Sequence, residues 1–331
     1  MSGMSSSPAD PVLVVDGVSK EYGVAGRRIA GHRPVLRAVE GASFTLGVGE
    51  TLGIVGESGC GKSTLARLLV GLERPTRGTV QIFGHQFARL SRTESRQLRR
   101  SIQLVMQDPY TSLDPRMTAG QIVTEPLQVH RDVVARPDRD RYVGELFEMV
   151  GLNPDHRNRY PHQFSGGQRQ RIGIARALAL HPKILVCDEP VSALDVSVQA
   201  QVLNLLSQLQ VELGLSYIFI GHDLSVVRHI SDRLLVLYLG KVVEYGTAAG
   251  IYGRPAHPYT EALLSAIPGK RGGSNGRIVL PGDPPSPTSR PTGCVFRTRC
   301  WKASAICEEV DPPLIELHRG GQEVACHFPN N

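Results

Sequence analysis

The spacing of apolar residues along the chain predicts an alternation of strands and helices. Short apolar runs over residues 12–15, 184–187 and 217–220, a further run from Thr51, and a partly alternating run over 36–46 are typical of strands. Apolar residues at i, i+3, i+4 and i+7 predict helices over residues 65–72, 143–150 and 202–209. Because strand, helix and strand follow one another from residue 184 to 220, we predict a parallel sheet with crossover helices, and hence an α/β fold.

The same patterns divide the chain. Residues from about 90 to 180 are mainly helical in character, with Gly151 as a predicted helix stop, so they form a helical insertion between strands. Eleven of the 23 prolines follow residue 254, together with a glycine-rich stretch. We therefore expect a disordered N-terminus over residues 1–10, one domain over 11–253, and a separate extension over 254–331.

Composition adds limits on the class of protein. The chain has 331 residues, of which 41% are hydrophobic, so it can bury an ordinary core. Its N-terminus is polar and no apolar run is long enough to cross a bilayer, so we expect neither a membrane span nor export. The net charge is +6, with basic clusters at Arg27, Arg28 and Arg33 and at Arg92, Arg96, Arg99 and Arg100. These clusters suit either a solvated face or an anionic surface such as lipid or nucleic acid.

A phosphate-binding loop follows the strand that begins at Thr51. Gly56 to Ser63 fit the pattern G-x-x-x-x-G-K-[ST], between a predicted strand and a predicted helix. Glycines allow backbone N–H groups to approach a polyphosphate, Lys62 supplies a positive charge for its β and γ phosphates, and Ser63 supplies a hydroxyl for Mg²⁺. The predicted nucleotide-binding residues of this segment are Gly56, Glu57, Ser58, Gly59, Cys60, Gly61, Lys62, Ser63 and Thr64.

Further polar motifs follow the loop in order. Gln107 ends an apolar strand, and Asp188 and Glu189 end another. Asp195 lies six residues after Glu189, and His222 follows the strand over 217–220. The sequence Ser165, Gly166, Gly167, Gln168 opens a helix, whose free N–H groups suit a phosphate.

This ordered set of motifs resembles the ATP-binding subunits of ABC transporters, over about residues 12–253. The resemblance implies a RecA-like core, an antiparallel β subdomain and a helical subdomain at about 90–180, with a small C-terminal extension. It also implies roles. Asp188 holds Mg²⁺ through its water shell, Glu189 polarises the attacking water, and Gln107 senses both. His222 contacts the γ-phosphate and Tyr22 stacks on adenine. From spacing alone, a packing role would suit Tyr22 equally well, and a lone histidine at a strand end is more often structural, so only the accompanying motifs favour the role of His222.

The resemblance further implies a dimer with ATP between its subunits. In the family, the residues matching Ser165, Gly166, Gly167 and Gln168 face the nucleotide of the other subunit, and the residue matching Asp195 lies across the same contact. This chain carries one such unit and therefore needs a partner. It departs from the common pattern at Phe164, Cys60 and Gly221, none of which removes a catalytic group.

Four short segments narrow the resemblance to the oligopeptide and dipeptide importers. The sequence is similar to these proteins, and most closely to the second of their two ATPase subunits, at residues 107–117, 188–201, 257–260 and 280–294. The resemblance implies a non-identical second ATPase, two membrane-spanning permease subunits and an extracellular or periplasmic binding protein. It places the chain at the cytoplasmic face of the cell membrane, as a peripheral protein with no nucleic-acid partner. Related importers carry nickel or other small solutes, so the sequence does not specify the cargo.

Four cysteines crowd into the C-terminal extension. Cys294, Cys300, Cys307 and Cys326 are spaced C-x5-C-x6-C-x18-C, which matches neither common zinc sites nor standard ferredoxins. They could meet around one metal or remain buried free thiols. Family resemblance favours a [4Fe–4S] cluster, while His318 and His327 nearby leave Zn²⁺ as an alternative.

Two rival functions follow from the same motifs. A soluble ABC ATPase of translation or DNA repair would usually carry two ATP-binding units or a long coiled-coil insertion, and neither is evident in this sequence. A regulatory protein whose cysteines sense redox state would not need the full set of hydrolytic residues. We therefore expect an active ATPase.

Overall fold

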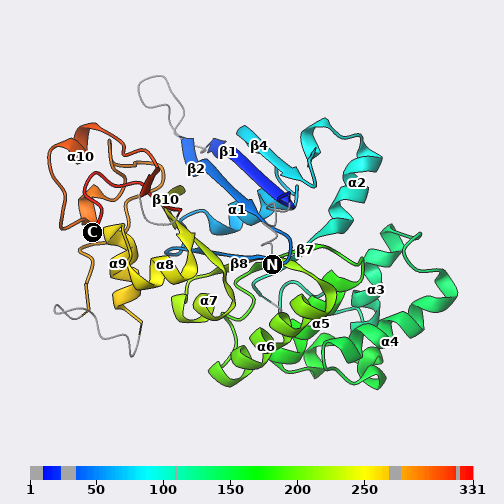
Figure 1. Cartoon of the computed structure of the whole chain (residues 1–331). Coiled ribbons are helices and arrows are strands. Elements are labelled where there is room, and N and C mark those ends of the chain that lie inside the picture. Colours follow the sequence, from blue (N-terminus) through cyan, green and yellow to red (C-terminus); the bar gives the residue numbers. More distant parts are fainter. Residues whose placement is uncertain (1–9, 24–34, 109, 268–276, 318–320, 331) are drawn as a thin grey trace, which may run out of the picture. The chain divides into compact units, whose positions relative to one another are not determined.

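The computed structural model describes residues 10–23, 35–108, 110–267, 277–317 and 321–330 (Figure 1). The chain forms two compact units. The first contains residues 47–50 and 89–218, and the second contains residues 11–46, 51–88 and 219–331. The predicted disorder of residues 1–9, the cluster of Arg27, Arg28 and Arg33, and His318 lie outside the described residues.

The first unit is mainly helical. Figure 1 shows α3, α4, α5 and α6 gathered in it. Its α-helices are α2 (Arg92–Ser101), α3 (Ala119–Val129), α4 (Arg139–Met149), α5 (Gly166–Leu178) and α6 (Val196–Leu213). Short 3₁₀ turns join them at η2 (Arg136–Asp138), η3 (Pro154–Asn158) and η4 (Pro161–Gln163).

Two parallel strands complete this unit. β6 (Ile102–Val105) pairs with β7 (Ile184–Asp188), with Val105 opposite Cys187. All of β7 except Asp188 is buried, which explains its unbroken apolar sequence. β8 (Ser216–Gly221) begins in the first unit and ends in the second. The strand, helix and strand predicted from residue 184 to 220 are thus confirmed.

The second unit contains an antiparallel sheet in the order β2-β1-β4-β5. Its strands are β1 (Leu13–Gly23), β2 (Val35–Leu46), β4 (Arg77–Ile82) and β5 (His85–Gln86), followed by η1 (Phe87–Arg89). β1 extends eight residues beyond the apolar run that predicts it, and Tyr22 lies near its end.

The remaining strands of the second unit lie on one side of β3 (Thr51–Val55), whose residues are all buried. β3 pairs in parallel with β9 (Arg233–Tyr238), and β10 (Lys241–Thr247), β12 (Gln322–Val324) and β11 (Ile315–Leu317) continue the sheet. Residues of the C-terminal extension therefore pair directly with β10. The helices are α1 (Lys62–Leu69), α7 (Leu224–Ile230), α8 (Ala248–Gly253), α9 (Pro258–Ser265) and α10 (Ile306–Glu309), with η5 (Arg297–Arg299).

One predicted helix is shorter than its apolar spacing suggests. α1 ends at Leu69, and Gly71 adopts a left-handed φ of 68°. Leu72, which the spacing places on the buried face, is 60% exposed. The expectation for Leu72 is therefore wrong, because the helix ends before the residue is reached. Among the described helices, none combines the length and apolar character needed to cross a bilayer.

Candidate functional site

The phosphate loop lies in the second unit, between β3 and α1. A Cβ at Gly56 would lie 2.2 Å from the Leu237 carbonyl oxygen, and one at Gly61 would lie 2.1 Å from that of Ala38. Both positions also have positive φ, of 157° and 109°. The loop therefore has glycine at these positions because neighbouring backbone leaves no room for a side chain.

Lys62 folds over this loop. Its side chain is buried, and Nζ donates to the carbonyl oxygens of Gly56 at 2.8 Å and Glu57 at 3.2 Å. The cation is thereby held beside the backbone amides that the sequence assigns to phosphate binding. Cys60, unusual in this motif, is buried, and burial raises the pKa of its thiol. This thiol is therefore protonated at neutral pH.

Tyr22 is held by the segment that follows α1. Its hydroxyl donates to a Glu73 carboxylate oxygen at 2.5 Å, and Lys20 Nζ lies 5.0 Å from the ring centroid. Burial raises the pKa of Tyr22, and the hydrogen bond to Glu73 adds to this effect. No sequence pattern singled out Glu73, although its carboxylate holds the hydroxyl of the Tyr22 ring that is predicted to stack on adenine.

Gln107 and Glu189 meet in the first unit. Gln107 Nε2 donates to Glu189 Oε2 at 3.1 Å. The contact follows from topology: β6 and β7 are parallel, so the residues just beyond Val105 and Cys187 emerge at the same edge. Asp188, the predicted Mg²⁺ residue, ends β7 immediately before Glu189.

Glu189 has a backbone conformation that is uncommon for its type. Its φ is 47°, in the left-handed region that favours glycine. Such strain is concentrated at active sites, where the surrounding structure imposes it. The Ser192 hydroxyl donates to the Glu189 carbonyl oxygen at 3.1 Å, which helps to hold this turn.

The predicted phosphate-facing helix is α5, and Ser165 caps its N-terminus. Ser165 Oγ accepts from the Gln168 N–H at 3.3 Å, and Gln168 Oε1 accepts from the Ser165 N–H at 3.0 Å. This capping box explains the serine and glutamine by local structure. The glycine at position 167 is explained by packing instead, because a Cβ there would lie 2.3 Å from Val198 Cγ1 of α6.

Asp195 caps α6 in the same unit. Its carboxylate accepts from the Val198 N–H at 2.9 Å and the Ser197 hydroxyl at 2.7 Å, and these bonds lower the pKa of Asp195. Because Asp195 is fully exposed, the cap leaves it at the surface.

His222 belongs to the second unit and follows β8 directly. Gly221 stands before it, where the family commonly has serine or threonine. A Cβ at Gly221 would lie 2.8 Å from Val227 Cγ2 of α7, so this chain has too little room for the larger residue.

The predicted site residues thus fall in both units. The second unit contains Tyr22, His222 and the phosphate-loop residues, including Ser58, Ser63 and Thr64. The first unit contains Gln107, Asp188, Glu189, Asp195 and the segment from Ser165 to Gln168. The structure brings Gln107 to Glu189 within the first unit.

The four C-terminal cysteines are neighbours in the second unit. Burial raises the pKa of Cys294 to about 11, and the charges of Cys307, Cys326 and Cys300 add to this. Burial also raises the pKa of Cys300 and Cys326. However, among the described residues no three His, Cys, Asp or Glu side chains are placed to share one metal ion. The positions of the four thiols therefore do not fit a metal ion or cluster. His327, the histidine of the zinc alternative, has its Nε2 2.9 Å from the Val310 carbonyl oxygen.

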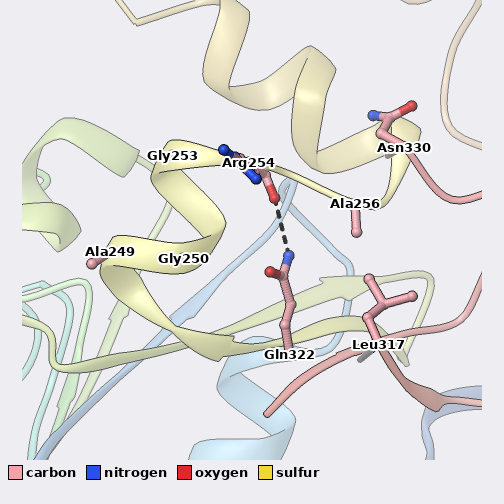
Figure 2. A pocket seen from close by; sticks show the side chains of 8 residues that line it. All are labelled: Ala249, Gly250, Gly253, Arg254, Ala256, Leu317, Gln322 and Asn330. Carbon is pink, nitrogen blue, oxygen red and sulfur yellow. Dashed lines mark hydrogen bonds between the residues drawn. The ribbon is translucent and has the colours of Figure 1, made fainter. Parts of the chain in front are cut away.

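A separate cavity within the second unit lies between α8 and residues of the C-terminal extension (Figure 2). It has a volume of about 520 Å³, and Gln322 crosses it to donate to the Arg254 carbonyl oxygen at 3.1 Å. Gln322 also donates to Glu244 at 2.6 Å. Glu244 is fully buried and accepts from the N–H groups of Ala256 and His257 at 2.7 and 2.9 Å. The sequence did not single out Glu244, which ties β10 to the extension.

Comparisons with known proteins agree with this arrangement. The profile described as "ABC transporter" matches residues 39–192, and the one described as "Oligopeptide/dipeptide transporter, C-terminal region" matches residues 243–307. The dimeric, ADP- and Pi-bound ATP-binding cassette MJ0796 has a TM-score of 0.63 and 31% identity, covering 71% of this chain and 98% of that chain. The chain therefore has the fold of the ABC ATPases. It is an ATP-binding protein of the ABC transporter family.

Relatives that match most of the chain define its family more narrowly. The oligopeptide transport ATP-binding protein AppF of Bacillus subtilis is 49% identical over 98% of this chain and 99% of its own length. The oligopeptide transport ATP-binding protein OppF of Salmonella typhimurium is 56% identical over 84% of each chain. The dipeptide transport ATP-binding protein DppF of Haemophilus influenzae is 51% identical over 96% of each chain. This chain belongs to the family of oligopeptide and dipeptide transport ATP-binding proteins.

Proposed function

We propose that this chain is the ATP-hydrolysing subunit of an ABC importer for peptides. The observation that carries the proposal is the match to peptide transport ATP-binding proteins over nearly the whole chain, 49% identical over 98% of it. The Gln107–Glu189 pair supports retained hydrolysis. We also propose residues 11–253 as the ATP-binding domain, with 254–331 as the family's extension.

In this proposal ATP binds along the phosphate loop. Tyr22 stacks on adenine, Lys62 neutralises the β and γ phosphates, and the backbone amides from Ser58 to Ser63 donate to them. Ser63, Gln107 and Asp188 would hold Mg²⁺, and their hydroxyl, amide and carboxylate oxygens are the donors that this cation prefers. The ion would neutralise charge that develops on the γ-phosphate.

Hydrolysis is assigned to Glu189. Its carboxylate accepts the proton of the attacking water, while the Gln107 amide donates to the other carboxylate oxygen and orients it. His222 donates to the γ-phosphate and stabilises the charge that develops there.

The proposal requires a second ATPase subunit. The N-terminus of α5 at Ser165, Gly166 and Gly167 would face that subunit's nucleotide, together with Asp195. The exposed position of Asp195 supports this, as does the dimeric state of MJ0796. By resemblance the second subunit is not identical to this one.

Membrane partners would contact the first unit. A groove of about 680 Å³ is lined by residues 110–117, Ile122, Glu125 and Arg176, and Tyr110 among them is 57% exposed. The groove begins three residues after Gln107, so a permease subunit docked there could sense the hydrolytic residues. The chain would then be a peripheral protein at the cytoplasmic face, served by an extracellular or periplasmic binding protein.

The metal at the four cysteines is a separate proposal. The family resemblance and the proximity of the cysteines support a [4Fe–4S] cluster, with Zn²⁺ as the alternative, but the side chains would have to rearrange to ligate either. Iron and acid-labile sulfide in anaerobically purified protein would support the cluster, and their absence would contradict it.

Copurification tests the transport assignment. The tagged chain, extracted from membranes with mild detergent, is expected to bring down two multi-span proteins and a second ATPase, identified by mass spectrometry. Ribosomal or DNA-repair proteins in their place would support a soluble ABC ATPase and refute import. A nickel-binding or other solute-binding protein in the complex would change the cargo only.

A further inference from the structure

The C-terminal extension contacts the phosphate loop within the second unit. Arg299 Nη1 lies 2.7 Å from Glu57 Oε2, across 242 residues of sequence. The Arg299 side chain is 8% exposed and that of Glu57 is 27% exposed, so this ion pair is largely shielded from water. Burial lowers the pKa of Arg299, but the contacts of its guanidinium with Glu57 and Tyr238 together outweigh this effect, and the pKa is raised overall.

A second contact reaches the same loop residue. The Glu57 N–H donates to the hydroxyl of Tyr259 at 2.9 Å. Tyr259 is fully buried, and its ring packs on those of Tyr238 and Phe296, with centroids 4.7 and 5.4 Å away. Both the backbone and the side chain of Glu57 are therefore held by residues of the extension.

The extension fixes Arg299 in turn. Its backbone N–H donates to the Phe296 carbonyl oxygen at 3.0 Å, and its Nε donates to the Pro281 carbonyl oxygen at 3.3 Å. Arg299 lies in η5, directly before Cys300. The guanidinium is thus anchored by the fold of the cysteine-containing segment before it reaches the loop.

The electrostatic consequence concerns phosphate binding. Glu57 places a carboxylate inside a loop built to bind anions, and an uncompensated carboxylate there would repel a polyphosphate. The Arg299 guanidinium neutralises it where low solvent exposure makes charge interactions strong. Tyr259 holds the Glu57 amide in place, so the loop keeps one backbone geometry.

We propose that Arg299 and Tyr259 are positioning residues of the ATP site, which make the affinity for ATP depend on docking of the C-terminal extension. They act through Glu57 and do not touch the nucleotide. This inference rests on the proposed function, because it assumes that the loop binds ATP.

Equilibrium binding of ATP with Mg²⁺ to the full-length chain, measured by calorimetry, tests the inference. Arg299→Met is expected to raise the Kd about 10-fold, which is typical of coupling between two sites. Arg297→Met is the matched control: Arg297 lies in the same short helix and pairs with Glu308 inside the extension at 3.4 Å. We expect it to change the Kd less than about twofold, as for an exposed ion pair.

A charge rescue separates positioning from general destabilisation. If Glu57 repels ATP once Arg299 is gone, Glu57→Gln combined with Arg299→Met should restore most of the lost affinity. A merely structural role of Arg299 would not be rescued in this way. An unchanged Kd in folded Arg299→Met, or no restoration in the double variant, would overturn the inference.

Tyr259→Phe keeps the test decisive if Arg299→Met does not fold. It removes the acceptor of the Glu57 N–H and preserves the ring packing, so the Kd is expected to rise a few-fold, about the effect of one hydrogen bond. An unchanged Kd in this variant would also count against the inference. A wild-type chain that binds no ATP would instead refute the proposed function.

Discussion

Gly167→Ala should destabilise the first unit, although alanine normally strengthens a helix. Alanine in place of glycine inside a helix adds about 0.8–1 kcal/mol of stability. Here the new Cβ would lie 2.3 Å from Val198 Cγ1, more than 1 Å inside ordinary contact distance. Separating α5 from α6 costs about 1–3 kcal/mol, the usual cost of overpacking, so the net loss is up to about 2 kcal/mol.

The same helix supplies the control for this variant. A Cβ at Gly173 would meet no atom within 4 Å, so Gly173→Ala should stabilise the protein by about 0.5–1 kcal/mol. Urea unfolding of both variants measures the difference, and Val198→Ala should relieve the penalty of Gly167→Ala. Equal stability of the two glycine variants would refute the packing argument.

Three further predictions concern the hydrolytic base, the buried carboxylate and a buried histidine. Glu189→Gln should lower the ATPase kcat by about 10² to 10⁴ while ATP binding persists, and near-normal turnover would show that another group is the base. Glu244→Ala leaves the buried N–H groups of Ala256 and His257 without an acceptor and leaves Gln322 Nε2 with the Arg254 carbonyl oxygen alone. It should lower the free energy of unfolding in urea by about 3 kcal/mol or more. A loss below about 1 kcal/mol, which is what we expect for the control Glu323→Ala, would contradict the assigned bonds. Burial lowers the pKa of His257 to about 3, so the unfolded chain, with a pKa of about 6.5, binds this proton first as pH falls. The free energy of unfolding should therefore fall by about 2 kcal/mol from pH 8 to pH 5 because of His257. His257→Asn keeps an acceptor at this helix cap but removes the titrating imidazole, so the variant should lack this fall. Identical pH profiles of unfolding for the variant and the wild type would contradict the prediction.

The order of strands and helices was largely predictable because it depends on local periodicity. The runs at 184–187, 202–209 and 217–220 became β7, α6 and β8. The contact between Gln107 and Glu189 also follows from sequence once β6 and β7 are taken as parallel neighbours. Leu72 shows the limit, since periodicity does not reveal where Gly71 ends the helix.

Contacts distant in sequence were not predictable. Nothing near Glu57 indicates that Arg299, 242 residues later, neutralises it. Glu244 lies within an apolar strand, and its partners at residues 256, 257 and 322 are supplied by the extension. The cysteine spacing left open whether the four thiols share one metal or stay free, and in the described part of the chain they are not arranged around one ion.

Peptide uptake tests the central claim most directly. Cells lacking this chain would be supplied with wild-type or Glu189→Gln protein at equal levels, and accumulation of labelled dipeptides and oligopeptides would be measured. The account predicts uptake with the wild-type chain and loss of it with Glu189→Gln. Equal uptake with both proteins, or without either, would contradict a role for this chain in driving peptide import.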